Sequence, residues 1–383
     1  MLNAMLPNPK LHLSGERFAV VYRLTAGSEA EAKARAEEVA LEQTVEFPGS
    51  LVPPGDIAQQ IVGRIEALEP AGAGAWLATL SYAVETAGGD FTQFLNVLFG
   101  NSSIKPGIRV ERFTLPASML AQYRGPRFGR AGLRAILNVA GRPLLCTALK
   151  PMGLSARELA DLAYRFALGG IDIIKDDHGL ADQPFSPFAE RVERCAEAVA
   201  RANRETGRKA IYMPNVTAPA GLVTERALQA KAAGAGGLLF CPGIAGLDAM
   251  RTLADDDRIG LPIMSHPAFQ GPFVTSRENG ISHYALFGQL ARLAGADATI
   301  YPNFGGRFSF SPEECRSIVA GCEVVMGNLA PIFPTPGGGM SLERIPELRE
   351  FYGREVIFLM GGGLFQGGSD LASNCRRFLE MIR

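Results

Sequence analysis

The chain has 383 residues, enough for two or three domains, and its 38 basic and 39 acidic side chains leave a formal charge of −1. This balance argues against nucleic-acid and anionic-membrane partners, which select clustered basic surfaces. No apolar run approaches the roughly 20 residues of a membrane helix. The first residues carry prolines and charges where a signal peptide has its apolar core, and the six cysteines form no C-x-x-C pair. We therefore expect a cytoplasmic protein with reduced thiols.

The N-terminal part of the chain alternates strand and helix patterns. They predict strands at 17–24, 76–84 and 107–115 and helices at 28–43 and 91–99. This order indicates a ferredoxin-like α+β domain, which we bound at residues 1–119. Residues 47–75 are the least clear part, because Pro and Gly dominate their first half.

From about residue 120 the pattern changes to repeated strand-then-helix units. The predicted strands are 143–150, 171–177, 209–216, 237–242, 262–266, 298–304, 329–336 and 356–363. Each connecting segment is long enough for a parallel crossover. Eight units in residues 120–383 match a C-terminal (β/α)₈ TIM barrel. An open doubly wound sheet is the alternative.

Charged residues end the second of these strands, in the run Lys175-Asp176-Asp177-His178. Side chains alternate along a strand, so Lys175 and Asp177 project to the same side. Such groups at the end of an apolar strand are unfavourable unless they are paired or hold a metal. The alternative is a solvated loop with a Lys–Asp ion pair.

Glycine clusters follow the last two strands and include Gly337, Gly338, Gly361 and Gly362. Glycine lets backbone N–H groups approach an anion closely, and the loops after strands seven and eight are a recurrent phosphate site in these barrels. We therefore predict a phosphate site there, against the alternative of plain turns.

Three more polar residues end predicted strands. Lys150 ends the first strand and is a candidate proton donor or acceptor, unless it extends to solvent. Asn215 ends the third strand and His266 the fifth, so both are expected at the barrel mouth. A lone histidine is more often structural than catalytic.

Several of these segments resemble the RuBisCO superfamily. The resemblance rests on GRPLLCTALKPMGLS (141–155), GGIDIIKDDHGLADQPFSPFAERV (169–192), MSHPAF (264–269), PTPGGG (334–339) and MGGGLFQGG (360–368). ALEQTVEFP (40–48) and FLNVLFGN (94–101) are similar to two active-site segments of the family's N-terminal domain.

The resemblance implies a Mg²⁺ site in which Lys175 is carbamylated by CO₂ and Asp177 is a ligand. A carbamate turns the lysine cation into an anionic oxygen donor, which suits a hard metal. In the position of the family's third ligand, a glutamate, stands His178, which changes the donor set.

The resemblance also implies other roles. Lys150 matches a lysine that moves protons at the substrate. Glu42 and Asn96 reach the barrel mouth of a partner subunit, which implies a homodimer with shared active sites. The glycines match the site of one substrate phosphate.

The departures from the family argue against carboxylation of ribulose bisphosphate. The lysine expected after Lys-Pro is absent, because Met152 follows Pro151. In place of the groups that hold the second phosphate stand Pro267 and the apolar Ile300 neighbourhood. Arg307 occupies the region of the mobile lysine, and we assign it to the substrate phosphates. The chain thus resembles the form IV, RuBisCO-like branch, acting on a monophosphate.

The shared chemistry of the superfamily is an enolate beside a carbonyl. Our first hypothesis is decarboxylation, or hydrolytic C–C cleavage, of 3-oxo-isoapionate 4-phosphate. This would make the chain a carbon–carbon lyase or hydrolase with Lys150, Lys175 and His266 as catalytic residues. The alternative is an enolase or isomerase of a methylthio-ketose phosphate in methionine salvage. The second alternative is a non-catalytic sugar-phosphate-binding protein.

Overall fold

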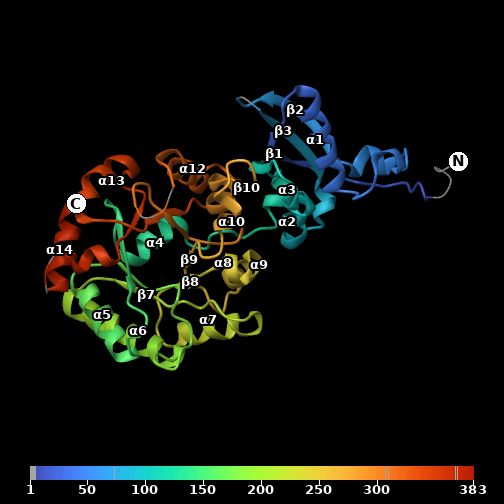
Figure 1. Ribbon diagram of the computed structural model, residues 1–383. Coiled ribbons are helices and arrows are strands. Elements are labelled where there is room, and N and C mark those ends of the chain that lie inside the picture. The colour runs from blue at the N-terminus through green and yellow to red at the C-terminus, as the bar shows by residue number, and fades with distance from the viewer. Residues whose placement is uncertain (1–5, 73, 307, 309, 367, 369) are drawn as a thin grey trace. The chain divides into compact units, whose positions relative to one another are not determined.

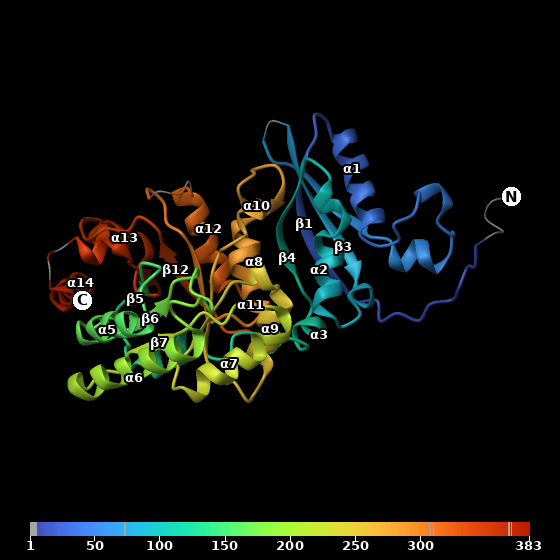
Figure 2. The same ribbon diagram turned by 60° about the horizontal axis from the view of Figure 1, so that its bottom comes forward.

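The computed structural model describes residues 6–72, 74–306, 308, 310–366, 368 and 370–383. The chain folds into two compact units (Figures 1 and 2). The first runs to Tyr123 and also takes in residues 270–289 and 325–328, and the second holds the remainder. The division at residues 119 and 120 stays a prediction, since later segments contribute to the first unit.

The first unit is built on a sheet with the strand order β10-β4-β1-β3-β2. Its strands are β1 (Arg17–Thr25), β2 (Arg64–Pro70), β3 (Ala75–Ala83), β4 (Ile108–Thr114) and β10 (Gly280–Ile281). Its main helices are α1 (Glu29–Glu42) and α2 (Phe91–Phe99), with the shorter α3 (Ala117–Leu120) and α10 (Gly271–Val274). β1 pairs antiparallel with both β3 and β4, and β2 with β3. The order βαββαβ confirms the ferredoxin-like prediction.

Aromatic side chains fill the core of this unit. Phe18 of β1 packs against Tyr82 and Phe94, with ring centroids 5.4 and 5.6 Å away. The Tyr22 hydroxyl donates to the Leu98 carbonyl at 2.8 Å, which ties β1 to the end of α2. Strand β2, in the unclear stretch, was not predicted. It is an edge strand without a fully buried side chain, so it lacks a clear apolar alternation.

The second unit is a closed parallel barrel. Its strands are β5 (Leu144–Leu149), β6 (Ile173–Asp176), β7 (Ile211–Met213), β8 (Leu238–Phe240), β9 (Ile263–Ser265), β11 (Ala298–Pro302), β12 (Phe333–Gly337) and β13 (Ile357–Leu359). They form the parallel runs β13-β5-β6-β7 and β8-β9-β11-β12. A parallel bridge between Asn215 and Leu239 joins β7 to β8, and β12 lies beside β13. Closure confirms the TIM-barrel prediction and excludes the open sheet.

Helices surround these strands (Figure 1). They are α4 (Gly129–Leu137), α5 (Ala156–Leu168), α6 (Phe188–Thr206), α7 (Val223–Ala232), α8 (Pro242–Ala245), α9 (Leu247–Asp255), α12 (Pro312–Glu323), α13 (Ile345–Tyr352) and α14 (Leu371–Met381). In both views α5 and α6 run side by side (Figure 2). One segment departs from α-helical geometry: residues Tyr284–Leu290 form a π-helix that continues into α11 (Ala291–Leu293).

Alternate residues of the strands fill the inside of the barrel. This core contains Leu133, Leu137, Leu144, Cys146, Ile173, Ile211, Met213, Leu239, Met264, Ala298, Ile300, Phe333 and Ile357. Leu133 and Leu137 belong to α4, and the rest come from all eight strands. The next inward positions toward the strands' carboxyl ends are therefore at the barrel mouth, where function resides in this fold.

No helix in the described part of the chain is long and apolar enough to cross a membrane. All six cysteines are buried and free. Cytoplasmic location stays a prediction.

Asp297 ties three backbone segments together at the opposite end of the barrel. Its buried carboxylate accepts hydrogen bonds from the backbone N–H groups of Phe128, Gly129 and Ile263 at 2.7–2.9 Å. These groups belong to the start of α4 and of β9. Because a buried N–H without an acceptor is unfavourable, Asp297 fixes where both elements begin.

Replacing Asp297 by Asn is expected to lower the free energy of unfolding by about 2–4 kcal/mol, since the amide NH₂ would face a backbone donor. Urea unfolding followed by circular dichroism measures this loss. Asp161→Asn is the matched control, because Asp161 is exposed. Its ion pair with Arg165, at 3.7 Å, lies at the surface and contributes little to stability. Equal stabilities of the two variants would contradict a structural role for Asp297.

Candidate active site

Five predicted residues occupy successive inward positions at the barrel mouth. Residues an even number of positions apart on a strand point to the same side, a relation called parity below. Lys150 follows β5 with the parity of the core residue Cys146, and Asn215 follows β7 with the parity of the core residue Met213. Lys175 lies on β6 with the parity of Ile173, while Asp177 and His266 continue β6 and β9 in the same way.

Lys175 is buried, with an exposed fraction of 1%. Its Nζ donates to the backbone carbonyl of Asp176 at 3.0 Å. Burial lowers its pKa, and the charge of Lys150 does so as well, against the opposing effect of Asp177. This environment favours the neutral amine, the form that reacts as a nucleophile with an electrophile such as CO₂.

Asp177 is an ionised carboxylate in contact with a lysine and a histidine. Lys150 Nζ lies 3.0 Å from Asp177 Oδ1, and His178 Nδ1 lies 3.4 Å from the same oxygen. Burial by itself would raise the pKa of Asp177, but the contact with His178, the charge of Lys175 and the contact with Lys150 lower it overall. A Lys–Asp ion pair thus exists, but its lysine comes from the neighbouring strand.

The two histidines of the site stack on each other. The rings of His178 and His266 are 4.3 Å apart and inclined by 16°. His266 Nδ1 accepts the Ala268 N–H at 3.1 Å, so in the neutral ring Nε2 carries the proton. Burial lowers the pKa of His266 well below its ordinary value, and Lys175 and His178 lower it further. His266 is therefore a neutral hydrogen-bond donor.

These donors fit a divalent cation only with a modified lysine. Among the described residues, no group of three His, Cys, Asp or Glu side chains is placed to hold a metal. Asp177 and His178 supply one carboxylate and one imidazole. Lys175 is buried and its neutral form is favoured, so it would supply a third ligand if it carried an anionic carbamate. That modification stays a prediction.

The glycines lie at the ends of the last two barrel strands. Gly337 ends β12, and Gly338 has φ +79°, a conformation that favours glycine. A Cβ at Gly361 or Gly362, after β13, would have no neighbour within 4 Å among the atoms described. β13 pairs with β5, the strand that leads to Lys150. The phosphate role stays a prediction.

Glu42 and Asn96 belong to the first unit, at the end of α1 and on α2. Buried Gln43 joins the two segments, because its Nε2 donates to the Asn96 carbonyl at 2.9 Å. Glu42 accepts from Asn101 at 3.1 Å and pairs with Lys105 at 3.2 Å. The fold thus brings these two predicted residues together, while their action in a partner subunit stays a prediction.

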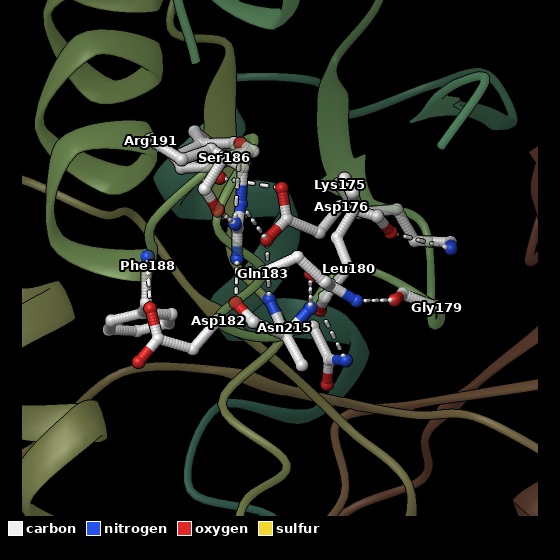
Figure 3. A network of polar contacts seen from close by, with 12 residues as sticks. Lys175, Asp176, Gly179, Leu180, Asp182, Gln183, Ser186, Phe188, Arg191 and Asn215 are labelled. Carbon is white, nitrogen blue, oxygen red and sulfur yellow. Dashed lines mark hydrogen bonds and ion pairs between the residues drawn. The ribbon is translucent and has the colours of Figure 1, made fainter. Parts of the chain in front are cut away.

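Asn215 differs from the prediction, because its side-chain amide contacts backbone. Nδ2 donates to the carbonyls of His178 and Leu180 at 3.0 and 2.9 Å, and Oδ1 accepts the Thr217 N–H. Figure 3 shows Asn215 beside Leu180. Buried Arg191, on α6, also lies in this network and was missed. A helical arginine next to a glutamate gives no sequence signal of burial. Arg307 lies outside the described residues, so its predicted role is not tested.

The chain is similar to known proteins over nearly its whole length. A family model described as the catalytic domain of the ribulose bisphosphate carboxylase large chain matches residues 129–308. A ribulose bisphosphate carboxylase-like protein 1 of Rhodopseudomonas palustris is 41% identical, with 96% of this chain and 98% of the relative covered. A 5-methylthioribulose-1-phosphate isomerase of Rhodospirillum rubrum is 38% identical, with 96% of each covered.

Solved structures agree. A Rubisco-like protein from Rhodopseudomonas palustris superposes with a TM-score of 0.87 at 36% identity, covering 96% of this chain and 98% of that chain. A dimeric archaeal Rubisco from Hyperthermus butylicus gives 0.86 at 27% identity, covering 97% and 91%. Neither of the two named relatives carries a decarboxylase name.

Replacing Lys175 by Met is expected to stabilise the unmodified protein by about 1–4 kcal/mol at neutral pH, because it removes a buried amine. The lowered pKa means that the folded state binds this proton less tightly than the unfolded state. The stability that Lys175 contributes is therefore present at high pH and lost as pH falls. The advantage of the variant should shrink between pH 7 and 9, by at most about 1.4 kcal/mol per unit.

Urea unfolding in CO₂-depleted buffer measures this difference, with Lys209→Met as the control at an exposed position before β7. A variant less stable than the wild type across this pH range would contradict the inferred burial of a destabilising amine.

Proposed function

This chain belongs to the RuBisCO large-chain family as a RuBisCO-like protein, and from that premise we propose that it is a metal-dependent isomerase or enolase of a methylthio-ketose monophosphate. The observation that carries the proposal is the grouping of five polar side chains at the carboxyl ends of β5, β6 and β9: Lys150, Lys175, Asp177, His178 and His266. The name of the isomerase relative supports this reaction class above C–C cleavage.

In the proposed site, Lys175 as its carbamate, Asp177 and His178 would hold Mg²⁺. When bound, the cation polarises the substrate carbonyl as a Lewis acid. The burial of Lys175 supports the carbamate, since only the neutral amine reacts with CO₂. The ionised state of Asp177 supports its role as a ligand.

Two residues of the chain act on the substrate directly. Lys150, at the edge of the site with a side chain 39% exposed, transfers the proton between adjacent carbons. His266 directs its Nε2–H donor at the oxygen that gains negative charge. The N–H groups near Gly338, Gly361 and Gly362 bind the single phosphate, which orients the sugar chain across the mouth.

Decarboxylation of 3-oxo-isoapionate 4-phosphate is the second candidate. One observation favours it: His178 replaces a carboxylate ligand, and loss of CO₂ forms an enolate without removing a C–H proton. Such a reaction tolerates a weaker metal site. A non-catalytic binding protein would retain the phosphate glycines but would not use Lys150.

We also propose a homodimer in which Glu42 and Asn96 of one subunit complete the other's site. The dimeric archaeal relative supports it. A further support is an apolar rim, which we define as the exposed large apolar side chains in the loops and short helices that follow the barrel strands. Among the described residues of the barrel unit, these are Met152, Phe185, Leu222, Ile244, Phe269, Phe308 and Phe365. Exposed apolar rims of this kind mark protein interfaces.

We expect the protein, incubated with Mg²⁺, bicarbonate and 5-methylthioribulose 1-phosphate in D₂O, to form an isomeric phosphate that contains deuterium. The reaction is followed by ¹H and ³¹P NMR. Lys150→Met should lower kcat about 10²–10⁴-fold, because the proton carrier is lost. Lys209→Met, at the opposite end of the barrel, should keep wild-type turnover. Release of CO₂ from 3-oxo-isoapionate 4-phosphate instead would favour the second candidate, and no turnover of either would contradict catalysis.

Shared active sites predict complementation between inactive variants. Lys175→Met and Glu42→Ala should each be inactive, but subunits mixed after dissociation should recover about a quarter of wild-type activity. Half of the dimers are then mixed, and one of their two sites is intact. Mixing Lys175→Met with Lys150→Met is the control, since both changes affect the same barrel and no intact site forms. Equal activity of both mixtures would exclude shared sites.

A further inference from the structure

A buried carboxylate, that of Asp176, immediately precedes the loop that carries two of the proposed metal ligands. Asp176, at the end of β6, is fully buried and accepts three hydrogen bonds. The Tyr212 hydroxyl donates to Oδ1 at 2.7 Å, while Arg191 Nε and the Asn215 backbone N–H donate to Oδ2, each at 3.1 Å. Because a buried charge must keep its partners, Asp176 fixes the positions of Arg191 and Asn215.

Arg191 extends from this carboxylate to the far part of the loop. Its side chain is fully buried, and its two terminal nitrogens donate to the carbonyls of Ser186 and Ala181, each at 2.7 Å. Figure 3 shows the guanidinium between Asp176 and these loop groups. One planar group therefore links the end of β6 to both ends of the segment 181–186.

Asn215 holds the near part of the loop. Its Nδ2 donates to the carbonyls of His178 and Leu180, so the backbone on both sides of Gly179 is fixed. Asn215, Gly179 and Leu180 are labelled in Figure 3. These bonds use both amide hydrogens of Asn215. The loop is thus held at four carbonyls by two side chains. Both residues are bonded to the Asp176 carboxylate, Arg191 through its side-chain Nε and Asn215 through its backbone N–H.

We propose that Asn215 and Arg191 are positioning residues, which hold the loop 177–187 so that Asp177 and His178 present their side chains together at the barrel mouth. The inference rests on the proposed metal site, because Asp177 and His178 are its ligands. Neither positioning residue coordinates the metal. Both act through the loop backbone, as supporting groups that orient ligands do.

Asn203 provides a matched control for Asn215. On α6, its Nδ2 donates to the Ala210 carbonyl at 2.8 Å and its Oδ1 accepts the Ala210 N–H at 2.9 Å. It thus also holds a loop by its amide, but at the opposite end of the barrel, before β7. Asn203→Ala and Asn215→Ala remove comparable bonds, so a general loss of stability affects both variants.

The experiment measures Mn²⁺ binding, by electron paramagnetic resonance with bicarbonate present, and hydrogen exchange of peptides that cover residues 177–187. Asn215→Ala is expected to weaken Mn²⁺ binding at least about tenfold and to accelerate exchange in this segment. Asn203→Ala should leave both as in the wild type. Wild-type Mn²⁺ affinity and exchange in Asn215→Ala would overturn the proposal.

Arg191→Lys is the second variant, in case Asn215→Ala does not fold. It keeps a positive charge beside Asp176 but cannot reach both carbonyls as a planar fork, so the same changes are expected. If the wild type binds no Mn²⁺, the proposed metal site fails, and hydrogen exchange alone decides the positioning role. Unchanged protection of 177–187 in the variants would then overturn it.

Discussion

The alternation of side chains along closed parallel strands is the constraint on which the candidate site depends. The same parity that directs Cys146, Ile173 and Met264 into the apolar core directs Lys150, Lys175 and His266 to the mouth. A shift of one residue in any strand would bury a charge against the helices and expose a core side chain to the site. The strand register that packs the core therefore also places the polar groups at the mouth.

Much of this arrangement could be predicted from sequence because it is local. The apolar strand cores and crossover lengths gave all eight barrel strands, and Lys175 and Asp177 share a side by alternation alone. Contacts between elements could not be predicted in this way. Asp177 pairs with Lys150 of the neighbouring strand, and the amide of Asn215 contacts backbone where we expected substrate.

The buried charge of Asp176 illustrates the same limit. Its partners are Arg191 on α6, Tyr212 on β7 and Asn215, two residues after β7, so nothing in the local pattern marks them. The sequence shows only two adjacent aspartates. Their different roles arise because adjacent side chains point to opposite sides of a strand. Asp176 points away from the barrel axis to Arg191, and Asp177 points inward. Alternation thus places Asp176 where it can hold the loop and Asp177 where it can face the proposed metal site.

The resemblance to the family implies a glutamate at the position of His178, and a histidine there has a consequence for the charge of the site. Lys150 and Lys175 give the unmodified site two amines against the single carboxylate of Asp177. Carbamylation would replace one amine by an anion, so two anionic ligands would balance a divalent cation, with His178 neutral. The charge of Lys150 would then remain uncompensated, whereas a glutamate in place of His178 would neutralise it. An excess positive charge beside the substrate stabilises a developing enolate, which is the step common to isomerisation and decarboxylation.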